Sequence, residues 1–335
     1  ARLRERATAA GRPLRPIALR MADVPEGATQ LANSAGSAPG LRVELPGGVV
    51  YALPGLPHEM HAITDEVLLP ELRSRSAGPV PLRRTLRTAG IWESVLASRL
   101  APVEALSGVR LAYLPGLAEI RVRITATGPD AQVLLGEAEE LTRDLLGTAV
   151  YGAEDDTLDR VVHRLLAERA ATVAVAESMT GGLLGAELTR MPGSSATFVG
   201  GVVSYATPLK AALLGVPSQL LDAHGAVHPQ VALAMATGAR DRLGASYGLA
   251  VTGVAGPEPQ DGRQVGTVHI GLAGPGNESA VESPTFPVRG GDDRARDLIR
   301  RMTVVHALDL LRRRILGLDA IRDWSDRQGD REEMA

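Results

Sequence analysis

In the second half of the chain, three glycine-rich turns that carry hydroxyl groups lie beside apolar runs. This pattern of runs and turns limits the class of fold more than any other feature of the sequence. Thr172–Ala176 reads as a short buried strand, 177–182 (ESMTGG) as the turn after it, and Leu183–Met191 as the next helix. The other two turns contain Ser194-Ser195 and Thr252-Gly253. Strands that alternate with helices predict an α/β fold, in which ligands collect where strand ends meet helix N-termini.

The pattern continues over residues 151–316, for which we expect a three-layer α/β/α domain. Asp156 or Thr157 can cap its first helix, because Leu158 and the apolar residues after it share one face. The other predicted helices are Leu209–Leu214, Pro229–Leu243 and Asp293–Leu316, and the other predicted strands are Phe198–Tyr205, Tyr247–Thr252, Gly266–Leu272 and Glu282–Val288. Residues 317–335 read as a charged, disordered tail.

Two further units are expected upstream, joined by a linker over residues 73–82. In residues 1–72 the strand Val49–Leu53 runs through a Pro/Gly turn into a helix, which indicates an α/β unit with an anion site or turn chemistry alone. Residues 83–150 predict a small α+β unit, with helices near Glu93–Leu100 and Ala131–Leu146 and strands at Thr85–Thr88, Val109–Leu114 and Ile120–Ile124. Arg121 and Arg123 should share the solvent-facing side of the last strand, where they either contact phosphates or are simply solvated.

Composition excludes several classes of function. The 335 residues contain no cysteine, which rules out disulfides and thiolate sites and is typical of a cytoplasmic protein. No apolar stretch approaches the roughly 20 residues of a membrane span. A formal net charge of -3 gives no overall field that would attract nucleic acid or an anionic membrane. We therefore expect neither as a partner.

Lys210 is the single lysine among 36 basic residues. Arginine serves for surface charge, whereas a desolvated lysine can lose its proton and act as a base. This lysine is either a chance remnant on a solvated helix or a residue that is kept for proton chemistry. Lys210 shares a short strand-to-helix connection with Tyr205, so a serine activated by lysine and tyrosine is feasible. No histidine stands in an esterase-like order with a Gly-x-Ser-x-Gly elbow.

Six ordered motifs make the chain resemble the C-terminal domain of the CinA family, the competence/damage-inducible proteins. They are 176–182 (AESMTGG), 193–195 (GSS), 203–205 (VSY) with Lys210, 225–227 (GAV), 252–257 (TGVAGP) and 265–268 (VGTV). In that family the domain is a nicotinamide-nucleotide amidohydrolase. The resemblance implies hydrolysis of the carboxamide of nicotinamide mononucleotide to nicotinate mononucleotide and ammonia, in a pathway of pyridine nucleotide salvage, without a metal or other cofactor.

Residue roles follow from the same resemblance. It implies Ser195 as the nucleophile, with Ser178 as the other candidate, and Tyr205 and Lys210 as its proton-handling partners. Met179 stands where the family usually has cysteine, which argues against a nucleophile at that position. The resemblance also implies that Arg296 and Arg300 contact the phosphate. The residues expected to contact the nucleotide or the oxyanion are Ser178, Thr180, Gly181, Thr252 and Gly253.

The resemblance extends upstream. Residues 1–72 look like the second half of the family's molybdopterin-binding-like domain, and 83–150 like its KH-like domain. The chain opens at Ala1, and residues 1–20 read as the end of an arginine-rich helix, so we expect a preceding segment. Half of a parallel-sheet domain should expose strand edges and apolar surface. A homo-oligomer is also expected.

Two other functions stay open on the sequence. In one, the same turns hold a nucleotide without turning it over, as in a regulatory module. The other is ADP-ribose pyrophosphatase, an activity associated with the family's first domain. The metal-linked Gly-Gly-x-Gly-Pro-Thr-x-Asp-Asp motif of that domain is absent from this sequence, which counts against it.

Overall fold

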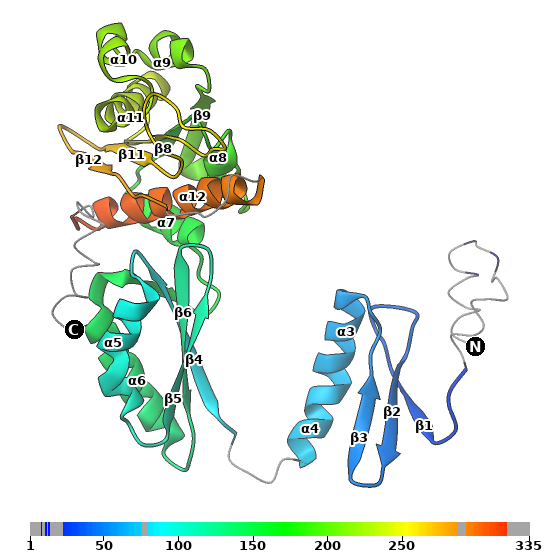
Figure 1. Cartoon of the computed structure of the whole chain (residues 1–335). Coiled ribbons are helices and arrows are strands. Elements are labelled where there is room, and N and C mark those ends of the chain that lie inside the picture. Colours follow the sequence, from blue (N-terminus) through cyan, green and yellow to red (C-terminus); the bar gives the residue numbers. More distant parts are fainter. Residues whose placement is uncertain are drawn as a thin grey trace. The chain divides into compact units, whose positions relative to one another are not determined.

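The computed structural model describes residues 23–75, 80–286 and 293–319, together with residues 8, 11 and 13 (Figure 1). It divides into two compact units, Ala1–Val80 and Pro81–Ala335. Most of the arginine-rich start of the chain and the tail beyond residue 319 lie outside the described residues, as does the end of the strand predicted at Glu282–Val288.

The first unit contains an antiparallel three-stranded sheet in the order β1-β2-β3, followed by a helical segment. Its elements are β1 (Ala28–Leu31), β2 (Gly40–Leu45), β3 (Gly48–Ala52), α3 (Pro57–Ile63), the π-helix η2 (Thr64–Leu68) and α4 (Leu69–Arg75). We expected half of a parallel sheet here, and for the described strands that expectation is wrong. Pro46 and Gly47 join β2 to β3 as a two-residue hairpin, which forces antiparallel pairing. Helix α4 also extends into the predicted linker.

The second unit begins with an antiparallel four-stranded sheet in the order β5-β6-β4-β7, and its chain order βαββαβ is that of a ferredoxin-like module. Helices α5 and α6 pack against it. Its elements are β4 (Leu82–Ala89), α5 (Glu93–Glu104), β5 (Val109–Pro115), β6 (Glu119–Ala126), α6 (Ala131–Leu146), the 3-10 helix η3 (Gly147–Ala149) and β7 (Val150–Ala153). The boundary we set between residues 150 and 151 therefore falls inside a strand.

Alternation on β6 follows the sequence pattern. Ile120, Val122 and Ile124 are buried beneath the helices, whereas Arg121 is exposed and Arg123 half-buried on the opposite face. A strand with this period has one face in the core and one in solvent. The prediction that the two arginines face away from the core is confirmed.

A five-stranded mixed sheet organises the rest of the second unit, in the order β12-β11-β10-β8-β9. Strands β8, β9 and β10 run parallel, while β11 and β12 are antiparallel to their neighbours. The strands are β8 (Val173–Glu177), β9 (Phe198–Val203), β10 (Tyr247–Gly253), β11 (Val268–Ala273) and β12 (Ser279–Glu282). All residues of β8, β10 and β11 are buried, because helices cover both faces.

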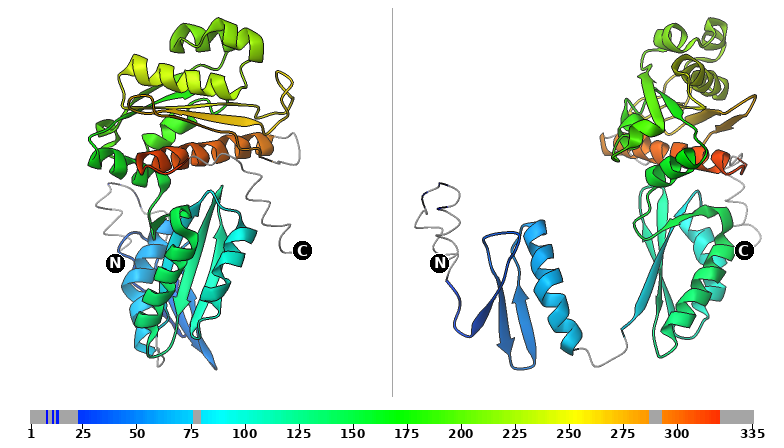
Figure 2. Two further views of the ribbon diagram at one scale, coloured as in Figure 1. Left: turned by 90° about the vertical axis from the view of Figure 1, so that its left-hand side faces the viewer. Right: turned by 180° about the vertical axis from the view of Figure 1, so that it is seen from behind.

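Helix α11 lies on one face of this sheet and α12 on the other (Figure 2). Helices α9 and α10 pack against α11, whereas α7 and α8 pack against α12. The helices are α7 (Leu158–Glu168), α8 (Leu183–Leu188), α9 (Thr207–Leu214), α10 (Ser218–His224), α11 (Pro229–Leu243) and α12 (Asp293–Ile315), with a 3-10 turn η4 (Ser194–Ala196) before β9. The expected α/β/α layering is therefore observed.

Glycines let α11 approach the sheet closely. A Cβ on Gly271 of β11 would lie 2.4 Å from the carbonyl of Ala232, and one on Gly248 of β10 would lie 1.9 Å from the carbonyl oxygen of Ala236. No side chain fits at either position. This contact fixes α11, and with it the segment 225–228 that precedes the helix, over the carboxyl ends of β8 and β10.

Candidate active site

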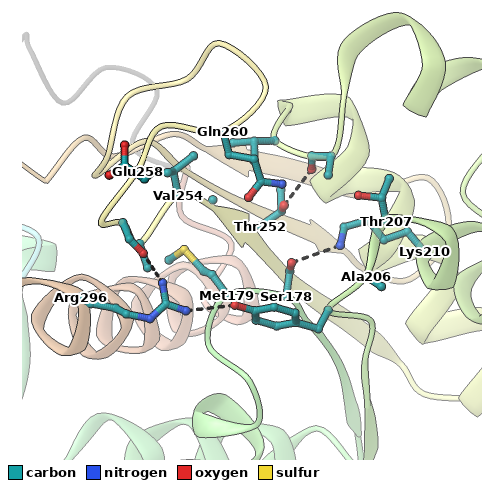
Figure 3. Close-up of a pocket in the computed structure, with 16 residues that line it drawn as sticks. Ser178, Met179, Ala206, Thr207, Lys210, Thr252, Val254, Glu258, Gln260 and Arg296 are labelled. Atoms are coloured by element: carbon teal, nitrogen blue, oxygen red, sulfur yellow. Dashed lines mark hydrogen bonds between the residues drawn. The ribbon is translucent and has the colours of Figure 1, made fainter. Parts of the chain in front are cut away.

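A cavity of about 270 Å³ opens at the carboxyl ends of β8 and β10, between those strands, the start of α9 and the N-terminal part of α12 (Figure 3). Parallel strands deliver the residues that follow them to one edge of a sheet, which is where α/β proteins bind ligands. Of the residues predicted to form the site, the lining includes Ser178, Tyr205, Lys210, Thr252, Gly253 and Arg296.

Lys210 reaches the floor of this cavity from the first turn of α9 and is only 1 % exposed. Its Nζ donates to the backbone carbonyl of Ser204 at 2.7 Å and to the Oγ of Ser178 at 3.1 Å. Ser178 directly follows β8, so two separate elements bring the pair together. A lysine amine within hydrogen-bonding distance of a serine hydroxyl is the arrangement that a serine–lysine nucleophile requires.

Burial lowers the pKa of Lys210 from its ordinary 10.5 to about 8, although the negative charge of Asp261 opposes that shift. Desolvation acts in this direction because it disfavours the charged ammonium. At pH 7 a group with this pKa is neutral in about one molecule in ten, whereas an unperturbed lysine is neutral in about one in several thousand. Lys210 can therefore act as a base near neutral pH.

The turn after β8 presents Ser178 in a fixed conformation. The Ser178 N–H donates to the carbonyl of Val251 at 3.1 Å, and its own carbonyl accepts from the N–H of Gly181 at 3.0 Å. Across the described residues, the N–H groups of Met179 and Thr180 have no protein acceptor. A backbone N–H just after a nucleophile is a common oxyanion donor, and Met179 lines the cavity, so its N–H is a candidate for that role.

Glu177 holds the same turn from below. Its buried carboxylate accepts from the N–H groups of Gly182, Leu184 and Gly185 at 2.8–3.1 Å. These are the N–H groups at the start of α8, a position that can hold an anion, and here the chain's own carboxylate occupies them. In the sequence, a glutamate at the end of a predicted buried strand was the indication that its carboxylate has a structural partner.

Thr180 and Gly181, both predicted to bind substrate, do not line the cavity. The Thr180 side chain is fully buried, and its hydroxyl has no partner among the described residues. Arg300 of α12 donates to the carbonyls of Met179 and Thr180, at 3.0 and 2.8 Å. Arg300 therefore holds the Ser178 turn in place. It does not line the cavity, where we expected it to contact the phosphate.

Arg296 lies one turn earlier on α12 and does line the cavity. Its guanidinium donates to the phenolic oxygen of Tyr205 at 3.0 Å and to the carbonyl of Gly256. Tyr205 is otherwise exposed, so this bond holds its ring at the cavity. A guanidinium has five N–H groups, which leaves donors for an anion.

Thr252 and Gly253 form the wall opposite Ser178. The buried Thr252 hydroxyl donates to the carbonyl of Ala226 at 2.8 Å. A Cβ on Gly253 would lie 2.7 Å from the carbonyl oxygen of Thr267 and 2.8 Å from the sulfur of Met179. Gly253 thus allows the Ser178 turn to approach β10 closely.

Ser195, which we predicted as the nucleophile, does not line this cavity. Strands β8 and β9 run parallel, and Ser178 follows the carboxyl end of β8 whereas Ser195 precedes the amino end of β9. The two serines therefore lie at opposite edges of the sheet, separated by a strand that is roughly 16 Å long. Ser195 is exposed, and Lys210 bonds Ser178 instead.

The loop between β10 and β11 adds residues that the sequence interpretation missed. Glu258 and Gln260 line the cavity, and Asp261 docks beside them on the segment before α11. The position of this loop, directly after a strand that ends in a Thr-Gly turn, could have indicated in the sequence that its residues reach the site.

In the parts of the chain that the structure describes, no group of three or more metal-ligating side chains occurs. Among the helices of the described residues, none combines the length and the hydropathy of a membrane-spanning segment.

The family model for the CinA C-terminal domain matches residues 155–315, and the model for the KH domain of damage-inducible protein CinA matches residues 83–152. Among solved structures, the competence/damage inducible protein CihA from Agrobacterium tumefaciens is 36% identical, with a TM-score of 0.43. That similarity covers 46% of this chain and 91% of that one.

Curated relatives align over most of the chain. A CinA-like protein of Frankia casuarinae (strain DSM 45818 / CECT 9043 / HFP020203 / CcI3) is 51% identical over 316 residues, which cover 92% of this chain and 71% of the relative. A CinA-like protein of Gloeobacter violaceus (strain ATCC 29082 / PCC 7421) is 44% identical over 334 residues, covering 97% and 76%. This chain belongs to the family of CinA-like proteins.

Proposed function

We propose that this protein is an amidohydrolase that converts nicotinamide mononucleotide to nicotinate mononucleotide and ammonia, with Ser178 as the nucleophile. The observation that carries the proposal is the 3.1 Å contact between the Nζ of buried Lys210 and the Oγ of Ser178. A structural lysine would ordinarily extend to solvent or pair with a carboxylate. This one ends on a hydroxyl and a carbonyl inside a cavity.

The reaction follows from the contacts of these two residues. Neutral Lys210 accepts the hydroxyl proton of Ser178 while the Oγ attacks the carboxamide carbon, and the N–H group of Met179 stabilises the resulting oxyanion. The Lys210 ammonium returns the proton to the amide nitrogen, the C–N bond breaks, and ammonia leaves an ester on Ser178. A water molecule then gives a proton to Lys210 and attacks the ester carbon. The acyl–Oγ bond breaks, and Lys210 returns the proton to the Oγ of Ser178 as the acid leaves.

Tyr205 and Arg296 extend the site toward the rest of the substrate. Because Lys210 contacts Ser178 directly, no step requires Tyr205 as a relay between them. The Tyr205 oxygen accepts from Arg296, so its own proton is free to be donated into the cavity. The guanidinium of Arg296 has the geometry that suits a phosphate group, which favours a nucleotide over free nicotinamide as the substrate.

Ammonia release from the purified chain tests this function. We expect release from nicotinamide mononucleotide, little from nicotinamide, and loss of activity in Lys210→Arg, because arginine does not deprotonate near neutral pH. Near-normal turnover by Lys210→Arg would exclude the lysine as the base. Calorimetric binding of the nucleotide without ammonia from a folded sample would instead favour the regulatory module. Metal-dependent release of a nucleoside monophosphate from ADP-ribose would favour the pyrophosphatase.

A further inference from the structure

The loop from Pro257 to Val265 folds back over the cavity and ends in a tight hairpin turn. Gln260 and Arg263 exchange backbone hydrogen bonds at 3.1 and 2.8 Å. Asp261 and Gly262 between them have φ angles of +52° and +72°, which is the geometry of an Asp-Gly type I′ turn. Glu258 and Gln260 on this loop line the cavity, so its position sets the shape of the site.

One side chain attaches the tip of this loop to the body of the domain. The Oδ2 of Asp261 accepts from the backbone N–H of Ala226 at 2.9 Å. A Cβ on Gly225 would lie 2.7–2.9 Å from side-chain atoms of Asp261, so glycine is required for the approach. Ala226 itself lines the cavity, and its carbonyl accepts the hydroxyl of Thr252. The Asp261 carboxylate thus connects the loop to the wall opposite Ser178.

The same carboxylate is placed to interact with the charge at Lys210. The charged side chains that line the cavity among the described residues are Lys210 itself, Glu258 of the loop and Arg296 of α12, with the phenol of Tyr205 beside them. Asp261 lies just behind this lining, because its carboxylate accepts from the N–H of the lining residue Ala226, and its negative charge raises the pKa of Lys210. In the reaction above, Lys210 gains a positive charge when Ser178 attacks. A nearby carboxylate stabilises that charge, as the aspartate of a Ser-His-Asp triad does for its histidine.

We propose that Asp261 is a positioning residue of the amidase site, which latches the 257–265 loop over the cavity through Ala226 and balances the charge that forms on Lys210. This inference rests on the proposed function, and its two parts separate experimentally. The latch predicts a structural change on loss of the carboxylate. The charge balance predicts a change in the pH dependence of catalysis.

Hydrogen exchange of the Ala226 amide tests the latch without reference to activity. In Asp261→Ala this amide should exchange at least about tenfold faster than in the wild type, because its acceptor is gone. In Asp261→Asn it should stay protected, since an asparagine oxygen still accepts and asparagine tolerates the left-handed conformation. Unchanged exchange in Asp261→Ala would overturn the latch, whether or not the protein hydrolyses any amide.

The pH profile of kcat/KM for nicotinamide mononucleotide tests the charge role. Asp261→Asn keeps the acceptor but removes the charge, so the acid limb of the profile should move to lower pH while the plateau falls. The difference from the wild type should shrink at high salt, because Asp261 is exposed and its field is screened. Asp222→Asn, which removes an exposed charge from α10, is the matched control and should leave the profile unchanged. A profile of Asp261→Asn identical to that of the wild type would refute the charge role, whereas an inactive wild type would refute the proposed function instead.

Discussion

Replacing Lys210 by methionine should stabilise the protein below pH 8 while it abolishes activity. The lysine is 1 % exposed, and burial lowers its pKa from 10.5 to about 8. Below pH 8 the side chain is protonated in both the folded and the unfolded chain, so the folded state carries the full free-energy cost of a desolvated ammonium. Methionine is similar in length, can fill the same space and has no charge to desolvate.

The size of the effect follows from the difference between the two pKa values. Between pH 8 and 10.5 the unfolded chain holds a proton on Lys210 that the folded chain has lost, so wild-type stability rises with pH. Above pH 10.5 the amine is neutral in both states. Because a tenfold change in a protonation equilibrium corresponds to about 1.36 kcal/mol, the difference between a pKa of 10.5 and one of about 8 amounts to about 3 kcal/mol. The advantage of the Lys210→Met variant should therefore shrink by about 3 kcal/mol between pH 7 and pH 11.

Urea denaturation of both proteins, followed by circular dichroism at several pH values, measures this change. The difference between variant and wild type isolates Lys210, because the titration of other groups is common to both proteins. A difference that stays constant from pH 7 to pH 11 would mean that the folded chain does not depress the pKa of Lys210. In that case Lys210 would not be a base near neutral pH, and the proposed mechanism would lose its proton acceptor.

Three further outcomes are expected. The kcat/KM of the wild type should rise with pH along an acid limb centred near pH 8, because only neutral Lys210 accepts a proton; a flat profile from pH 6 to 9 would contradict this. Glu177→Gln should lower the free energy of unfolding by about 3 kcal/mol, since the amide cannot replace three hydrogen bonds to a carboxylate. It should also reduce kcat more than it raises KM. Thermal melts measure the first effect and steady-state kinetics the second. Gly271→Ala should destabilise by about 1–3 kcal/mol because its Cβ would overlap Ala232, whereas Gly136→Ala, in open space on α6, should be neutral or slightly stabilising in the same melts.

Much of the architecture was predictable because the apolar periodicity is strong. Helix α6 begins and ends where the pattern placed it, at Ala131 and Leu146, and the buried strand after Thr172 is β8. Weaker segments were misplaced. Over the described residues the last strand of the sheet is Ser279–Glu282, which ends at the residue where the predicted strand was to begin. As an edge strand it has only one buried residue among its four, so its sequence pattern is faint.

The candidate site was predictable in its residue types but not in its pairing. The sequence singled out Lys210 by its rarity and placed Tyr205 beside it. It gave no means to decide between Ser178 and Ser195, because that choice depends on which edge of the sheet each turn occupies. The parallel pairing of β8 with β9 places Ser178, and not Ser195, at the edge of the sheet where Lys210 lies. The role of Glu177 was hidden for a similar reason, since nothing local indicates that its side chain turns back onto the following helix.

Mass spectrometry of a rapidly quenched reaction with nicotinamide mononucleotide tests the central claim most directly. The account predicts an ester of the nicotinate mononucleotide acyl group on the peptide that contains Ser178, absent from Ser178→Ala, which should also release no ammonia. Ser195→Ala should form the same ester and turn over normally. An adduct on Ser195, or ammonia release by Ser178→Ala at the wild-type rate, would contradict the account.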